Sequence, residues 1–132
     1  MSERGAIKYE ERYKQLISYE GMERRRLITP TDIDGFIDYN GNAFIMFEGK
    51  LIDKSIDYGQ KLAFEHLINR LNIPACLLFF RHNSKSNEII IAKDCIVYEI
   101  YFKKEWTKHG NVTVLQCVEQ FEQYCTKLGI SL

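Results

Sequence analysis

The tripeptide Asn40-Gly41-Asn42 constrains the fold of this chain more than any other feature. It separates two stretches rich in apolar residues, 32–39 and 43–51. An Asn-Gly pair between two such stretches is a strong signal for a β-hairpin, because both residues tolerate the backbone conformation of a tight turn. The two stretches are therefore predicted to form neighbouring antiparallel strands.

Two further stretches, one on each side of the hairpin, have the apolar spacing of helices. Residues 8–20 repeat apolar side chains at a helical period, and Gly21 can end that helix. Ser55 can cap a second helix over about 56–72. The buried face of this second helix is expected to consist of Ala63, Phe64, Leu67 and Leu71.

The second half of the chain contains mainly extended stretches. Residues 75–80 are an apolar run typical of a buried strand, and 88–92 and 95–102 are predicted to be two more strands. Thr113 and Gln116 have the spacing of a capping box, which predicts a final helix. Its inward residues are expected to be Leu115, Val118, Phe121, Cys125 and Leu128. The predicted fold class is mixed α/β, with a central mixed β-sheet flanked by helices in the order α-β-β-α-β-β-β-α.

The composition is that of one globular domain over residues 1–132. Hydrophobic residues make up 45% and charged residues 27%, which excludes a disordered chain. No apolar run reaches the roughly 18 residues of a membrane helix, and the polar N-terminus does not resemble a secretory signal. No membrane association and a cytoplasmic location are therefore expected. The four cysteines lack metal-ligand spacing and are expected to be free thiols: Cys76, Cys95, Cys117 and Cys125.

The charge balance limits the kinds of nucleic-acid binding that are expected. Eighteen basic residues match eighteen acidic ones, which argues against a histone-like or coating protein but not against a nuclease. Two basic groups are candidates for phosphate contacts, although runs of charge are most often solvated surface. They are Arg24, Arg25 and Arg26 in the first group, and Lys103, Lys104, Lys108 and His109 in the second.

The hairpin carries two acids and a lysine whose placement depends on the length of its loop. A two-residue loop would set Asp34 and Glu48 on opposite faces of the sheet. A three-residue loop pairs Asp34 with Glu48, whereas a loop over 39–41 opposes Asp32 to Glu48. Either odd loop places Asp34, Glu48 and Lys50 on one face. We predict an odd loop.

This set of groups suits metal-dependent cleavage of phosphodiesters. Asp34 and Glu48 would hold Mg²⁺ or Mn²⁺, with the carbonyl of Gly49 as a further candidate ligand. The metal would lower the pKa of a bound water and neutralise charge on the phosphate. Lys50 would orient the water or stabilise the developing charge. Gln60 lies on the helical stripe that faces the sheet, where a polar group needs a partner.

Each of these residues also has a simpler structural interpretation. Asp34 could cap a turn or pair with an arginine, and Glu48 and Lys50 could form an exposed charged pair. Gln60 could be a surface residue at the start of a helix. The combination of all four in this order and on these faces favours a site.

The arrangement resembles the PD-(D/E)xK nuclease superfamily. The segment Ile33-Asp34-Gly35-Phe36 matches its apolar-Asp-Gly-apolar motif, and Glu48-Gly49-Lys50 matches its (D/E)xK element. Gln60 matches a helix glutamine of several branches. Small virus-type replication-repair nucleases and Holliday junction resolvases look most similar. The resemblance implies a restriction-endonuclease-like core, with Asp34 and Glu48 as metal ligands, Lys50 as a catalytic residue and Gln60 as support.

The resemblance also implies a further metal ligand in some members. These proteins use a glutamate from the first helix, and Glu10 is assigned here because it shares a helical face with Tyr13 and Ile17. Three other glutamates stay open as alternatives: Glu11, Glu20 and Glu23.

The expected function is a metal-dependent deoxyribonuclease in replication, recombination, repair or phage DNA processing. Its partners would be DNA, a second copy of the chain, since cutting two strands suits two sites, and a targeting protein. The alternative is a catalytically silent interaction module on the nuclease fold, such as a phage-encoded accessory protein that binds host machinery.

Overall fold

The computed structural model describes residues 17–28 and 30–132, which belong to two compact units, 1–30 and 31–132. In the first unit the described residues contain a short 3-10 helix, η1 (Arg25–Leu27). The helix predicted at 8–20 lies mostly outside the described residues, and its described part, 17–20, is not helical. Ile17, the one described residue of the predicted apolar face, is 78% exposed and so gains no burial there.

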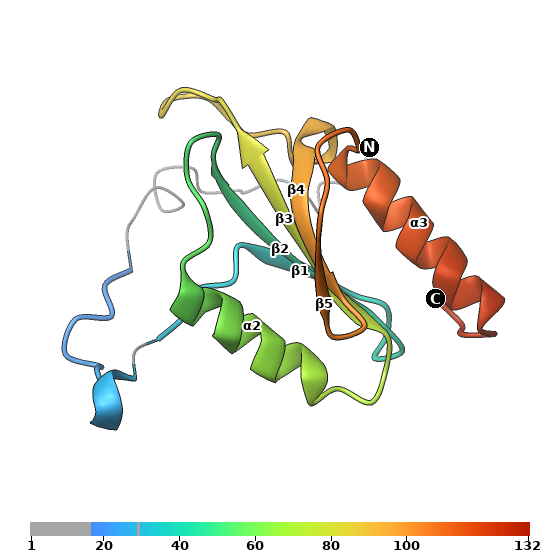
Figure 1. Ribbon diagram of the computed structural model, residues 1–132, viewed down its shortest axis with the longest axis horizontal. Helices are drawn as coiled ribbons and strands as arrows, with labels where there is room; N and C mark the ends of the chain where they lie inside the picture. The colour runs from blue at the N-terminus through green and yellow to red at the C-terminus, as the bar shows by residue number, and fades with distance from the viewer. Residues whose placement is uncertain (1–16, 29) are drawn as a thin grey trace. The chain divides into compact units, whose positions relative to one another are not determined.

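The second unit is built on one five-stranded sheet whose strands lie side by side in chain order (Figure 1). The strands are β1 (Gly35–Asp38), β2 (Phe44–Leu51), β3 (Ala75–His82), β4 (Ile96–Phe102) and β5 (Glu105–Lys108). β2 and β3 are parallel and every other neighbouring pair is antiparallel, so the sheet is mixed, as predicted.

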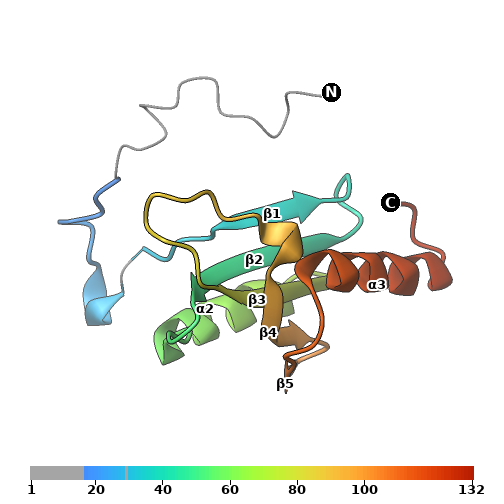
Figure 2. The ribbon, with the colours of Figure 1, turned by 90° about the horizontal axis from the view of Figure 1, so that it is seen from above.

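Two helices cover opposite faces of the sheet (Figures 1 and 2). α2 (Tyr58–Asn69) connects the parallel strands β2 and β3, which need a crossover of this kind. α3 (Val114–Lys127) follows β5. β3 is apolar on both faces, because Leu77 and Phe79 pack on the α2 side while Leu78 and Phe80 pack on the α3 side.

The hairpin has the odd loop that its sequence predicts. Tyr39 donates its backbone N–H to the carbonyl of Ala43, so residues 40–42 form the loop. Asn40 and Gly41 both have positive φ, at 57° and 80°, which is the conformation that an Asn-Gly pair tolerates. The register beyond the loop then pairs Gly35 with Phe47.

The described residues have the order β-β-α-β-β-β-α, not the predicted α-β-β-α-β-β-β-α, and most of the predicted first helix lies outside them. The strand predicted at 88–92 is also wrong: this stretch is a loop that leads into the 3-10 helix η2 (Ala92–Asp94). Ile89 is 84% exposed, because β4 already occupies the edge of β3 with which such a strand would pair. β5, over residues 105–108, was not predicted from the sequence.

α2 and α3 lie where helices were predicted, but the cap of α2 and the buried residues of both helices differ from the prediction. α2 is capped by Asp57, not Ser55, and buries Phe64 and Ile68, while Leu67 is 41% exposed. α3 has the predicted capping box of Thr113 and Gln116. Its buried stripe begins one residue earlier than predicted, with Leu115 and Leu128 exposed and these side chains inside: Val114, Cys117, Phe121 and Cys125.

The four cysteines are free thiols, as predicted. Cys76, Cys117 and Cys125 are buried free thiols, and Cys95 is a partly buried one. Among the residues that the structure describes, no helix is both long and apolar enough to cross a membrane.

Candidate functional site

The four predicted residues of the second unit come together at the ends of β1, β2 and the start of α2. Asp34 directly precedes β1, and the pairing of Gly35 with Phe47 places it beside Glu48. Its Oδ2 accepts a hydrogen bond from the backbone N–H of Gly49 at 2.8 Å. The odd loop therefore has the effect predicted for it, because it brings Asp34 to the Glu48 segment.

Glu48 is the centre of the arrangement and is only 3% exposed. Its Oε2 accepts a hydrogen bond from Nε2 of Gln60 at 2.9 Å and forms an ion pair with Nζ of Lys50 at 3.3 Å. Its Oε1 is buried and has no hydrogen-bond partner among the described residues. One oxygen of this carboxylate thus has two partners, while the other has none in the described part of the chain.

Gln60 is held in place by the first turn of α2. Its backbone N–H donates to Oδ1 of the cap residue Asp57 at 2.7 Å, which fixes where the helix begins. Its side-chain amide donates to Glu48, while its Oε1 is buried without a partner in the described part of the chain. Two buried oxygen atoms without donors therefore belong to contacting side chains.

The environment raises the pKa of Glu48. Burial is the largest cause and the negative charge of Asp34 is the second, while Lys50 and Gln60 act in the opposite direction. Burial disfavours the charged form, and a like charge nearby adds to this effect. A positive ion between the two acids would reverse it.

The oxygen atoms fit a hard divalent cation. Unpaired Oε1 of Glu48 and the carboxylate of Asp34 are ligands of the type that Mg²⁺ and Mn²⁺ prefer. Within residues 17–28 and 30–132, no group of three His, Cys, Asp or Glu side chains is placed to hold a metal. Glu10, the predicted third carboxylate, lies outside the described residues.

Two charged residues near this set were missed by the sequence analysis. Glu99 is 5% exposed and pairs with Lys61 of α2 at 3.1 Å, in the same row across the sheet as Glu48 and Phe79. Arg81 lies beside Lys50 in the register of β2 and β3. The signal for Arg81 is its position directly after the apolar run of a buried parallel strand, where ligands commonly bind.

The basic groups predicted to contact phosphates have separate locations. Lys103 and Lys104 form the turn after β4, at the opposite end of the sheet from Lys50. Lys108 lies opposite Glu99 and is therefore at the same end as the site. Arg24, Arg25 and Arg26 belong to the first unit.

Comparison with models of protein families, with curated proteins and with solved structures found no match to this chain. Its chemistry is therefore inferred from its own residues.

Proposed function

We propose that this chain is a Mg²⁺- or Mn²⁺-dependent deoxyribonuclease of the PD-(D/E)xK type. The observation that supports this most is that the two carboxylate oxygens of Glu48 have different surroundings. Lys50 and Gln60 hold one carboxylate oxygen, while the other is buried with no partner among the described residues, and the negative charge of Asp34 acts on the same carboxylate. A side chain that binds a cation needs a carboxylate oxygen without another partner. A purely structural ion pair does not need one.

In this function Asp34 and Glu48 hold the metal, which supplies an activated water and neutralises charge on the phosphate. Gln60 fixes the orientation of the Glu48 carboxylate through its 2.9 Å hydrogen bond. Lys50, 29% exposed, faces solvent beside Glu48 and can donate hydrogen bonds to the attacking water and to a phosphate oxygen.

The reaction is the hydrolysis of a phosphodiester. Water forms a new P–O bond, the bond from phosphorus to one sugar oxygen breaks, and that oxygen takes up a proton. Lys50 is the nearest described donor of positive charge to the carboxylate at which the water would lie. Its role is to stabilise negative charge that increases on the phosphate during attack.

The balanced charge of the chain bears on the substrate. Eighteen basic and eighteen acidic residues leave no excess that would bind any DNA strongly along its length. DNA structure, free ends or a targeting partner would then select the substrate. A second copy of the chain would let the protein cut both strands.

Cleavage of single-stranded, double-stranded and branched DNA tests this function. The wild-type protein is expected to cut at least one of these substrates with Mg²⁺ or Mn²⁺ and none in EDTA. Lys50→Ala should lower the rate by about 100-fold or more, as for other groups that stabilise transition-state charge. Lys54→Ala, an exposed lysine in the turn after β2, is the matched control and should change the rate by less than about 2-fold. Cutting that persists in Lys50→Ala contradicts the proposal.

A catalytically silent interaction module is the second candidate. A run of exposed isoleucines favours it: Ile89, Ile90 and Ile91 are 84%, 42% and 52% exposed. Contiguous exposed apolar residues often mark sites of protein contact. This candidate predicts no cleavage and no binding of Mn²⁺, so that Glu48→Ala would leave partner binding unchanged.

A further inference from the structure

Arg81 and Lys108 both lie against the ring of Tyr98, and we call these three side chains the Tyr98 cluster. Cζ of Arg81 is 3.4 Å from the centre of the ring, and Nζ of Lys108 is 5.7 Å from it. β4 has a register irregularity here, because Phe79 pairs with Glu99 while Phe80 pairs with Val97. The bulge leaves Tyr98 as the extra residue of β4, and such bulges commonly re-aim a side chain beside a functional site.

In the described part of the chain, only some of the N–H groups of the Arg81 guanidinium have a hydrogen-bond acceptor. Its Nη2 donates to Oγ of Ser55 at 3.1 Å, and its Nε is buried with no hydrogen-bond partner among the described residues. Among the described residues, two ion pairs form, Lys50 with Glu48 and Lys61 with Glu99. No described carboxylate therefore lies within 4.0 Å of the Arg81 guanidinium. A half-buried cation without a counter-ion is costly, and an anion would relieve that cost.

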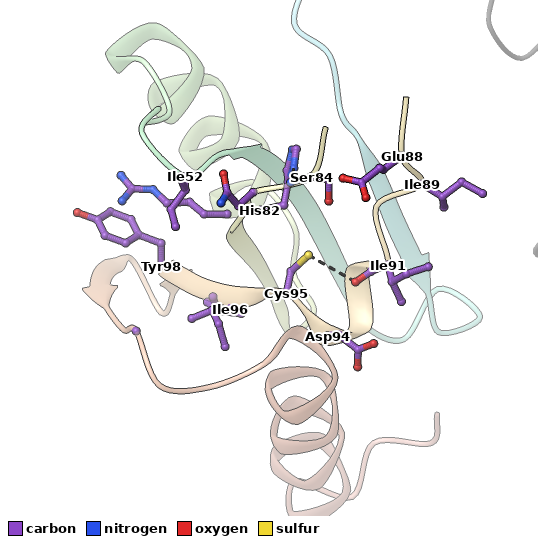
Figure 3. A pocket seen from close by; sticks show the side chains of 14 residues that line it. Ile52, His82, Ser84, Glu88, Ile89, Ile91, Asp94, Cys95, Ile96 and Tyr98 are labelled. Carbon is purple, nitrogen blue, oxygen red and sulfur yellow. Dashed lines mark hydrogen bonds between the residues drawn. The ribbon is translucent and has the colours of Figure 1, made fainter. Parts of the chain in front are cut away.

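Arg81 is also reachable from solvent. It lines an open pocket of about 790 Å³ at the ends of β2 and β3. Figure 3 shows Tyr98 and Ile52 at one end of this pocket and Glu88 and Ile89 at the other. The acids of the pocket, Glu88 and Asp94, make no ion pair with Arg81. A ligand can therefore approach the cation from the pocket side.

Arg81 lies in the same row of the sheet as Lys50, whereas Lys108 lies in the row of Glu48, Phe79 and Glu99. Arg81 pairs with Lys50 in the parallel register of β2 and β3, and paired residues of neighbouring strands project to the same face. Lys108 on β5 lies opposite Glu99, at the same end of the sheet. Lys50 and Arg81 are thus neighbours on β2 and β3, and Lys108 of β5 reaches the same Tyr98 ring as Arg81.

We propose that Arg81, assisted by Lys108, binds a backbone phosphate of a nucleic-acid strand next to the phosphate held at Glu48 and Lys50. The guanidinium suits this ligand because its N–H groups match phosphate oxygens and because stacking on Tyr98 pre-orients it. The neighbouring scissile phosphate is part of the proposed function, on which this assignment depends. Binding of a phosphodiester by Arg81 can be measured without any cleavage.

The first experiment measures binding of fluorescent oligonucleotides by anisotropy at low salt in EDTA, where no cutting occurs. Arg81→Gln should weaken binding about 10-fold and lower the slope of log affinity against log salt by about 1. Arg81→Lys keeps the charge and should keep that slope, which separates phosphate binding from a structural role. Lys127→Gln, at an exposed lysine near the end of α3, is the matched control and should bind like wild type.

The second experiment follows the Nε–Hε signal of Arg81 by NMR, identified by its absence in Arg81→Gln. Titration with dimethyl phosphate and with an oligonucleotide should shift this signal saturably, with the oligonucleotide acting at lower concentration. A shift caused by inorganic phosphate alone would assign the site to free phosphate and overturn the proposal. No shift, or equal DNA binding by wild type and Arg81→Gln, would overturn it as well. Absence of cleavage together with loss of binding in Arg81→Gln would reject only the nuclease activity.

Discussion

The carboxylate of Glu48 is buried beside a second acid, and its two oxygens have different surroundings. One oxygen contacts Lys50 and Gln60, and the other contacts no donor among the described residues. Sequence alone could predict that Asp34, Glu48 and Lys50 share a face, because strand alternation and loop length decide it. It could not predict the burial of Glu48 or the free oxygen, because both depend on how α2 packs.

Replacing Glu48 by Gln tests the electrostatic cost of this burial. A carboxyl whose pKa is raised on folding stabilises the folded state at low pH, and this contribution is lost as the pH rises through the raised pKa. Glu48→Gln is therefore expected to raise the free energy of unfolding of the metal-free protein at neutral pH. This gain in the free energy of unfolding should shrink as the pH falls, because protonation also removes the buried charge of the wild-type carboxyl.

Urea unfolding in EDTA at several pH values measures this difference. The control is Glu119→Gln, because Glu119 is exposed on α3. A Glu48→Gln protein that is less stable than wild type at every pH would contradict this account of the site.

Gly49, between Glu48 and Lys50, has a steric reason to be glycine. A Cβ added at this position would lie 2.6 Å from Cε1 and Cζ of Phe80. Gly49→Ala is therefore expected to lower the free energy of unfolding by about 1–3 kcal/mol. Gly110→Ala is the control, because its Cβ would meet nothing within 4 Å. Equal stability of the two variants in urea would show that Phe80 moves aside freely.

At the scale of elements, the hairpin and the two helices are what the sequence predicts best. The Asn-Gly turn and the capping box of Thr113 and Gln116 are local signals, and both are confirmed. The strand predicted at 88–92 failed because a strand needs a partner, and β4 occupies the edge of β3. β5 was missed for the same reason: its four residues form a strand only because β4 offers an edge.

The cap of α2 links helix stability to the site. Asp57 accepts the backbone N–H of Gln60, whose side chain holds Glu48. Asp57→Ala should lower the free energy of unfolding by about 1 kcal/mol and reduce cleavage, since the first turn of α2 would fray. Asp53→Ala, in the exposed turn before it, should change stability by less than about 0.5 kcal/mol. Urea unfolding and cleavage rates of both variants measure the effect, and identical behaviour would contradict a role for the cap.

At the scale of the second unit, the two faces of the sheet differ in the polarity of their buried residues. The α3 face is an apolar core of residues such as Ile45, Leu78 and Phe121, and none of the described residues buries a charge there. The α2 face carries the two acids that are buried in the described part of the chain, Glu48 and Glu99, each paired with a lysine. Each acid has a charged partner there, but Oε1 of Glu48 has no hydrogen-bond partner among the described residues, so this end of the sheet keeps an oxygen that a ligand could use.

Titration with Mn²⁺, by calorimetry or by electron paramagnetic resonance, tests the central claim that Asp34 and Glu48 hold a divalent cation. Wild type is expected to bind Mn²⁺ at this site, and Asp34→Asn and Glu48→Gln should each weaken binding about 10-fold or more. Asp53→Asn, an exposed acid outside the site, should bind like wild type. A protein that binds no Mn²⁺, or one whose binding is unchanged in Glu48→Gln, would contradict the claim.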